Sequence, residues 1–170
     1  MRLAGPTVIG SSVVAAALLI AGCGGGSGGS SIAPASKPLR SGSALVNSST
    51  TASLGDILVG PNGHTLYVFL KDTGPKSSCS GACASDWPPL TTTGKLTTAG
   101  GVSTSALKTE RRSDGTMQVT FDGHPLYYYA GDLAPGDANG QGLDMFGAKW
   151  FALTPAGKPI TSVHGPFGGY

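Results

Sequence analysis

A repeated phrase constrains the fold of this chain more than any other feature. The stretch NGHTLYVFLKD at residues 62–72 lines up without a gap with DGHPLYYYAGD at residues 122–132. Both stretches contain Gly-His, then Leu-Tyr, an aromatic residue two positions after the Tyr, and an Asp three positions further on. A second match follows, because Trp87-Pro-Pro-Leu-Thr aligns with Trp150-Phe-Ala-Leu-Thr. The chain therefore contains two copies of one unit, and its fold must accommodate both.

Hydrophobic periodicity predicts that each unit begins with a β-hairpin. Residues 116–121, Thr-Met-Gln-Val-Thr-Phe, alternate between polar and apolar side chains, which is typical of a half-buried strand. Asp122 and Gly123 then suit a two-residue turn with positive φ values, and residues 124–130 are predicted to form the return strand. The earlier copy predicts the same arrangement, with a first strand at 57–59, a turn at 62–63 and a return strand at 64–70.

The two units are predicted to form one small all-β domain. Each unit consists of a hairpin, a long loop and a Trp-led strand, and a lone hairpin is only marginally stable in water. Two such units packed together can close a shared core, with Trp87 and Trp150 as buried anchors. We expect this domain over residues 52–170, with repeat one at about 55–97 and repeat two at about 115–162. The 28 glycines and 12 prolines argue against long helices.

The amino-terminal residues predict export. The apolar run at residues 13–20 is too short to span a bilayer and fits the hydrophobic region of a secretory signal peptide. Ile-Ala-Gly-Cys at 20–23 resembles the lipobox of bacterial lipoproteins, in which the Cys receives a diacylglycerol and the signal is cut before it. We therefore expect a signal peptide over residues 1–22, cleaved between Gly22 and Cys23. Acyl chains such as palmitate on Cys23 would anchor the protein in the cell membrane, facing the extracytoplasmic side.

Composition predicts a tether behind this anchor and argues against a nucleic-acid partner. Residues 23–51 are rich in Gly and Ser and contain few large apolar side chains, so we expect a flexible linker. The formal net charge is +2, and the basic residues are scattered apart from Arg111 and Arg112. No basic patch for nucleic acid is apparent. The expected partners are the lipid bilayer, through acylated Cys23, and an unknown ligand or protein of the cell envelope.

The repeated phrase also resembles a known family pattern, Y-x-(F/W/Y)-x-x-D. Its fixed positions are Tyr67, Phe69 and Asp72 in the first copy and Tyr127, Tyr129 and Asp132 in the second. Together with Cys79-x-x-x-Cys83 before Trp87 and the Gly-rich loop at 135–142 before Trp150, the pattern resembles predicted bacterial lipoproteins described as a secreted repeat of unknown function. The resemblance covers essentially the whole domain. It implies an exported, repeat-built protein and transfers no catalytic residue.

The motif can also be interpreted from its physical chemistry. On an extended strand, Tyr67 and Phe69 point to one face, while Leu66, Val68 and Leu70 point to the other, so the strand should be covered on both sides. Asp72 and Asp132 come where the strands should end and can accept hydrogen bonds from loop N–H groups or from a tyrosine hydroxyl. The alternative is that the aromatic side chains form a stacking platform for a ligand.

Two cysteines remain once Cys23 carries a lipid. In an oxidising compartment, a disulfide between Cys79 and Cys83 is the first expectation. The alternative is a copper site in which two thiolates are joined by His64 or His124. The motifs C-x-x-x-C-x-x-x-H and C-x-x-C-H are both absent, so no cofactor is expected, with copper as the alternative.

Three function hypotheses follow. The first is a membrane-anchored lipoprotein that acts as a non-catalytic binding or structural module of the cell envelope. The second is an envelope redox or copper-handling lipoprotein that uses Cys79 and Cys83 with histidine. The third is an envelope hydrolase, which has little support because the chain has no nucleophile elbow, zinc-protease motif or phosphate loop. We therefore expect no catalytic residues and no enzyme activity.

Overall fold

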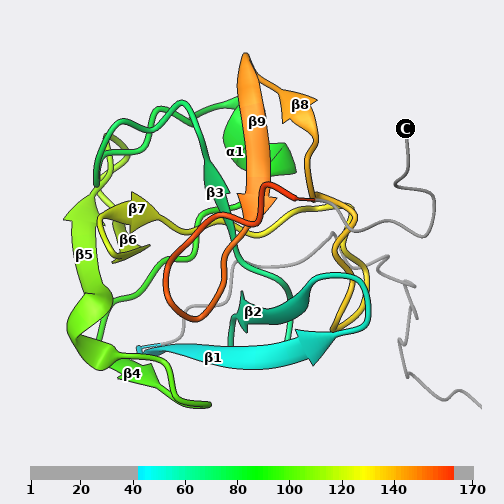
Figure 1. The fold of residues 1–170 in the computed structure, drawn as a ribbon. Coiled ribbons are helices and arrows are strands. Elements are labelled where there is room, and N and C mark those ends of the chain that lie inside the picture. The colour runs from blue at the N-terminus through cyan, green and yellow to red at the C-terminus, as the bar shows by residue number, and fades with distance from the viewer. Residues whose placement is uncertain (1–41, 163–170) are drawn as a thin grey trace, which may run out of the picture. The chain divides into compact units, whose positions relative to one another are not determined.

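The computed structural model describes residues 42–162, which form three small sheets (Figure 1). The strand orders are β2-β1-β4, β3-β9-β8 and β5-β6-β7. The described helices are short, with α1 at Ala82–Asp86 and the 3-10 helix η1 at Thr104–Ala106. The prediction of an all-β domain is confirmed.

The first sheet begins earlier in the chain than the sequence suggested. Strand β1 (Ala44–Thr51) pairs antiparallel with β2 (Gly55–Val59) and parallel with β4 (Leu96–Thr98). The side chains of Ala44 and Val46 are buried in the core. The prediction that residues 44–51 belong to the flexible tether is therefore wrong. Small and polar residues predict a linker, but here the segment is held as a strand because it pairs with β2 on one side and β4 on the other.

The other two sheets contain the predicted hairpin and Trp-led elements. In one, β9 (Ala148–Ala152) pairs antiparallel with β3 (Tyr67–Phe69) on one side and with β8 (Asp144–Met145) on the other. In the other, β6 (Met117–Phe121) pairs antiparallel with β5 (Leu107–Arg111) and with β7 (His124–Pro125). Figure 1 shows β5 and β8 on different sides of the domain.

The two predicted hairpin turns differ by one residue. Asp122 and Gly123, with φ values of 49° and 81°, connect Phe121 to its partner His124, which is the expected two-residue turn. In the first copy, the N–H of Gly60 donates to the carbonyl of His64, so Pro61 joins the turn. The return segments are also less regular than predicted, because β3 covers only residues 67–69 and β7 only residues 124–125.

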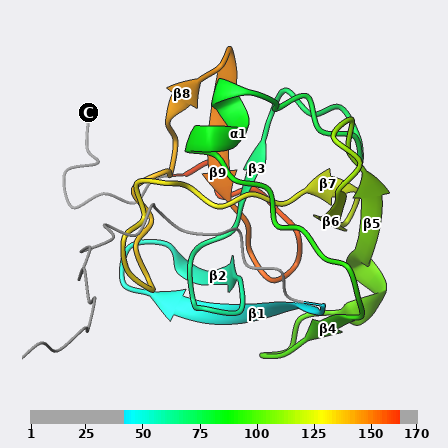
Figure 2. The ribbon, with the colours of Figure 1, turned by 180° about the vertical axis from the view of Figure 1, so that it is seen from behind.

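The Trp-led segments differ as well. Trp150 lies within β9, as predicted. Trp87 instead follows α1 directly, and the chain after it forms isolated bridges at Pro89 and Thr91 rather than a strand. The cysteine-containing loop includes this short helix, and the N–H of Trp87 caps it by donating to the carbonyl of Cys83 at 2.8 Å. Figure 2 shows α1 in front of β9, and both contribute side chains to the same apolar cluster.

One ladder and several backbone bonds join each repeat to the other. Strand β3 of the first copy pairs with β9 of the second, and Tyr127 of the second copy bridges Pro89 of the first. Equivalent N–H groups make equivalent bonds, because Leu58 donates to the carbonyl of Leu153 and Val119 donates to that of Leu90, both at 2.8 Å. The repeats are therefore interlocked rather than placed side by side.

The alternation along β3 divides the core into two apolar clusters. Tyr67 and Phe69 contribute to one cluster with both tryptophans, while Leu66 and Val68 contribute to the other. This confirms the prediction that the segment is covered on both faces. Leu70 departs from it, since its side chain is 49% exposed. In the part of the chain that the structure describes, no helix is long and apolar enough to cross a membrane.

Truncating either tryptophan should cost most of the stability of the domain. Both side chains are fully buried, and replacing such a residue by Ala typically costs about 3–5 kcal/mol. We expect Trp87→Ala and Trp150→Ala to lower the free energy of unfolding, measured by denaturant titration, by about that amount. Leu133→Ala is the control, because Leu133 is 86% exposed and its truncation should change stability by less than about 0.5 kcal/mol. Losses below about 1 kcal/mol at both tryptophans would contradict this core assignment.

Candidate functional site

The two motif tyrosines face each other at the centre of the domain. The N–H of Tyr67 donates to the carbonyl of Tyr127 at 2.8 Å, and the N–H of Tyr127 donates back to the carbonyl of Tyr67 at 3.0 Å. Such a reciprocal pair is the hydrogen-bonded pair of an antiparallel ladder. It relates the two motifs to each other by an approximate two-fold axis.

The tyrosine and aspartate side chains are exchanged between the motifs. The hydroxyl of Tyr67 donates to Asp132 Oδ2 at 2.7 Å, and the hydroxyl of Tyr127 donates to Asp72 Oδ2 at 2.6 Å. All four side chains are buried. The tyrosine of each motif therefore bonds the aspartate of the other, although the sequence places a tyrosine and an aspartate in every copy.

The second oxygen of each aspartate holds the loop that follows its motif. Asp72 Oδ1 accepts from the backbone N–H and from the hydroxyl of Ser78, both at 2.7 Å. Asp132 Oδ1 accepts from the N–H of Asn139 at 2.8 Å. The predicted role of the two aspartates, as acceptors for loop N–H groups and tyrosine hydroxyls, is confirmed by these contacts.

Burial changes the acidity of the two tyrosines and of Asp132. Burial first, and then the hydrogen bond to Asp132 and its charge, raise the pKa of Tyr67 above its usual value. The pKa of Tyr127 is raised in the same way, by burial and then by Asp72. Burial also raises the pKa of the Asp132 carboxyl, although the bonds from Tyr67 and Asn139 oppose this. These tyrosines are neutral donors over the physiological pH range.

The aromatic side chains stack into a column of four rings. Trp87 and Trp150 lie face to face at the centre, with ring centroids 3.9 Å apart and an interplanar angle of 5°. Phe69 stacks on the outer face of Trp150 at 4.1 Å, and Tyr129 lies on the outer face of Trp87 at 4.4 Å. Each tryptophan thus stacks with the motif aromatic of the other repeat. Tyr67 contacts Trp87 edge-on at 5.4 Å, and Tyr127 contacts Trp150 in the same manner at 5.1 Å.

The packing of this column explains one glycine in the second long loop. A Cβ at Gly140 would lie 2.8 Å from Trp87 Cη2 and 3.0 Å from Tyr67 Cζ, so only glycine lets the backbone approach here.

The two indole nitrogens differ in their hydrogen bonding. Trp150 Nε1 donates to the carbonyl of Met145 at 3.1 Å. Trp87 Nε1 is buried and has no acceptor among the described residues, which is a cost that the stacking must offset.

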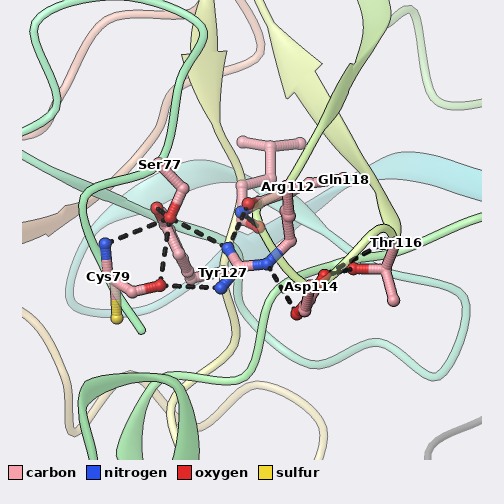
Figure 3. A network of polar contacts seen from close by, with 8 residues as sticks. Ser77, Cys79, Arg112, Asp114, Thr116, Gln118 and Tyr127 are labelled. Carbon is pink, nitrogen blue, oxygen red and sulfur yellow. Dashed lines mark hydrogen bonds and ion pairs between the residues drawn. The ribbon is translucent and has the colours of Figure 1, made fainter. Parts of the chain in front are cut away.

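A buried arginine reinforces the first loop, and sequence reasoning missed it (Figure 3). The Nη1 of Arg112 donates to Ser77 Oγ at 2.9 Å and to Gln118 Oε1 at 2.6 Å, and its Nη2 donates to the carbonyl of Cys79 at 2.7 Å. Ser77 Oγ also lies 2.7 Å from the hydroxyl of Tyr127. The network therefore joins the tyrosine pair to β6, to the residue that follows β5 and to the cysteine loop. No feature of Arg111-Arg112 in the sequence distinguishes the buried guanidinium from the exposed one.

A disulfide joins Cys79 and Cys83, and both residues are buried. The sulfurs are bonded to each other, so they do not present the two thiolates that the copper alternative requires. Among residues 42–162, no three His, Cys, Asp or Glu side chains are grouped as metal ligands would be. His64 and His124 instead lie at the turns of the two hairpins, partly buried.

The motif side chains make their contacts within the domain rather than at its surface. The motif hydroxyls and carboxylates are engaged with each other, and of the four stacked rings Phe69, Trp87 and Trp150 are buried while Tyr129 is partly exposed. The aromatic platform for a ligand is therefore not presented to solvent as a flat surface. The predicted lipidation and cleavage positions, Cys23 and Gly22, lie outside the described residues.

Double-mutant cycles should detect the exchange of partners between the motifs. We expect Tyr67→Phe and Asp132→Asn to be coupled by about 1–3 kcal/mol in the free energy of unfolding, because they share a buried hydrogen bond to a carboxylate. Tyr67→Phe and Asp72→Asn lie in the same motif but share no hydrogen bond, so their effects should add to within about 0.5 kcal/mol. Equal coupling in both cycles would show that the contacts are not exchanged.

Alkaline pH should destabilise the domain through the same tyrosines. In the unfolded chain a tyrosine loses its proton near its ordinary pKa of 10.0, whereas the folded protein keeps it at higher pH. Stability is therefore fully present below pH 10 and falls as the pH rises, by about 1.4 kcal/mol per pH unit for each such tyrosine. We expect the Tyr67→Phe/Tyr127→Phe variant to show a shallower decline in denaturant titrations above pH 10. Identical slopes for this variant and the wild type would contradict the prediction.

Comparison with known proteins places the chain in a family. A family model described as "Secreted repeat of unknown function" matches twice, at residues 48–91 and 108–154. The two matched segments begin within β1 and within β5, include β2 and β6, and end just beyond the respective tryptophans. No curated protein and no solved structure matches the chain. The chain belongs to this family of secreted lipoprotein repeats and carries two copies of the repeat.

Proposed function

We propose that the protein is a lipid-anchored, non-catalytic binding or structural module of the bacterial cell envelope. The observation that carries the proposal is the exchange of tyrosine and aspartate side chains between the repeats. Because the polar groups of the family motif are used to close the domain, the motif is accounted for by stability. The folded domain follows a lipobox and a Gly/Ser-rich linker in the sequence, as expected for a domain that is presented on a lipid anchor.

The disulfide supports an extracytoplasmic location. Disulfides form and persist in oxidising compartments and are rare in the bacterial cytoplasm. The Cys79–Cys83 bond lies beside the stacked tryptophans and contributes to the same apolar cluster, so an oxidised loop is part of the core. Location and fold are thereby consistent with a family described as secreted.

A non-catalytic role is favoured by the state of the acidic and basic groups. Asp72, Asp132 and Arg112 are buried and held by hydrogen bonds, as expected for groups that position loops. General acid–base catalysis requires a group within hydrogen-bond reach of a bound substrate. The motif carboxylates instead contact tyrosines and loop N–H groups.

Replacing the lipobox cysteine should release the protein from the membrane. Cells grown with an alkyne-tagged fatty acid should incorporate the tag into the wild type, and the tagged protein should fractionate with membranes. Cys23→Ala should abolish both results, because no other residue of the lipobox offers a thiol. The double variant Cys79→Ser/Cys83→Ser is the matched control and should keep the tag. Incorporation of the tag into Cys23→Ala would refute the anchor.

A further inference from the structure

The tip of the β8–β9 hairpin carries a residue that neither the turn nor the core explains. Met145 pairs with Ala148, so Phe146 and Gly147 form a two-residue turn, with φ values of 59° and 89°. The turn at Asp122 and Gly123 has nearly the same φ values, 49° and 81°, and uses the Asp-Gly pair that such turns prefer.

Phenylalanine is unfavourable at this position on two independent counts. A bulky L-residue with positive φ has a strained backbone, and Asn, Asp or Gly would remove most of the strain. The side chain is also 37% exposed and belongs to neither apolar cluster of the core. A strained residue that is not required by packing points to a role outside the fold.

Further apolar and basic side chains lie beside this tip. The N–H of Leu70 donates to the carbonyl of Lys149 at 3.0 Å, and Lys71 Nζ donates to the carbonyl of Phe146 at 3.3 Å. Leu70 is 49% exposed, and both lysines are exposed. Asp144 lies opposite Lys149 in the ladder and offsets one of the two lysine charges. We call Leu70, Lys71, Phe146 and Lys149 the tip patch.

From this geometry we propose that the tip patch docks on the bilayer surface that holds the anchor. Phe146 and Leu70 enter the headgroup region, and Lys71 and Lys149 face anionic phospholipid headgroups. An aromatic tip flanked by lysines has the chemistry of side chains at a membrane interface. The inference rests on the proposed lipid at Cys23.

The size of the patch favours a bilayer over a protein partner. A stable protein–protein interface needs about 800 Å² from each partner, far more than two partly exposed apolar side chains supply. A weak contact is sufficient for a tethered domain, because the tether keeps the membrane at a high effective concentration. Residues 24–41 separate the anchor from the described domain. Eighteen residues can span at most about 60 Å, which sets the greatest distance between the anchor and the domain.

The test places a fluorophore near the tip and another far from it. Asp144→Cys lies on the hairpin and Thr109→Cys on β5, on different sides of the domain in both views (Figures 1 and 2). The lipidated full chain is placed in vesicles of phosphatidylcholine and phosphatidylglycerol that contain a doxyl-labelled phospholipid, which quenches nearby fluorophores. We expect quenching at position 144 to exceed that at position 109 several-fold. It should weaken in vesicles of phosphatidylcholine alone.

The matched variants separate docking from folding. Phe146→Asn introduces the preferred Asn-Gly turn, so its unfolding midpoint should equal or exceed that of the wild type. Its quenching at position 144 should fall to the level seen at position 109, whereas Phe146→Tyr should retain strong quenching. Equal quenching at both positions in the wild type, or full quenching in Phe146→Asn, would overturn the proposal. Concentration-dependent self-association lost in Phe146→Asn, without lipid quenching, would overturn it in favour of a second copy.

The state of Cys23 tells the two proposals apart. If the mass of the purified chain shows lipid on Cys23 but no quenching is seen, docking is wrong and the anchor stands. If Cys23 carries no lipid, the anchor and the docking that rests on it both fail.

Discussion

Two buried carboxylates determine how this domain must close. A carboxylate removed from water costs several kcal/mol unless it receives hydrogen bonds, and Asp72 and Asp132 are each only 6% exposed. Each receives its bonds from its own following loop and from the tyrosine of the other repeat. The backbone pair between Tyr67 and Tyr127 sets the axis on which this exchange is possible. The pairing of β3 with β9, the stacking of each tryptophan with the motif aromatic of the other repeat, and the bonds from each aspartate to its loop are arranged about the same axis.

The loops that follow the two motifs are held in place by different groups. In the first loop, Ser78 donates to Asp72 and Ser77 contacts the hydroxyl of Tyr127. The disulfide closes the helical turn there, and the buried guanidinium of Arg112 donates to the carbonyl of Cys79. In the second loop, Gly140 allows the backbone to reach Trp87, and the side chain of Gln141 accepts from the N–H of Ala152 at 2.8 Å. The first loop is thus held by a disulfide and a charged guanidinium. The second is held by a close backbone approach at Gly140 and by the amide side chain of Gln141.

The local features of the fold could be predicted from the sequence, and the long-range contacts could not. The alternation of side chains predicted strand β6 and the two faces of β3, and Asp122-Gly123 predicted the turn between β6 and β7. These features depend on residues that are neighbours in the sequence. Strand β1 was missed because its pairing with β2 and β4 outweighs a polar composition. The exchange of Tyr67 and Tyr127 partners was also missed. Each motif holds a matching Tyr and Asp, and only three-dimensional pairing decides between them.

The interlocked pairing also governs the order in which an exported chain can fold. A chain that crosses a membrane amino end first presents β3 long before its partner β9 has emerged. Until residues 150–152 arrive, β3 keeps an unpaired apolar edge, and such edges aggregate or recruit chaperones. Closure of the first half must therefore wait for nearly the whole domain, so its folding depends on contacts between distant residues and is intrinsically slow. Tandem duplication of this kind makes the domain stable only as a completed pair.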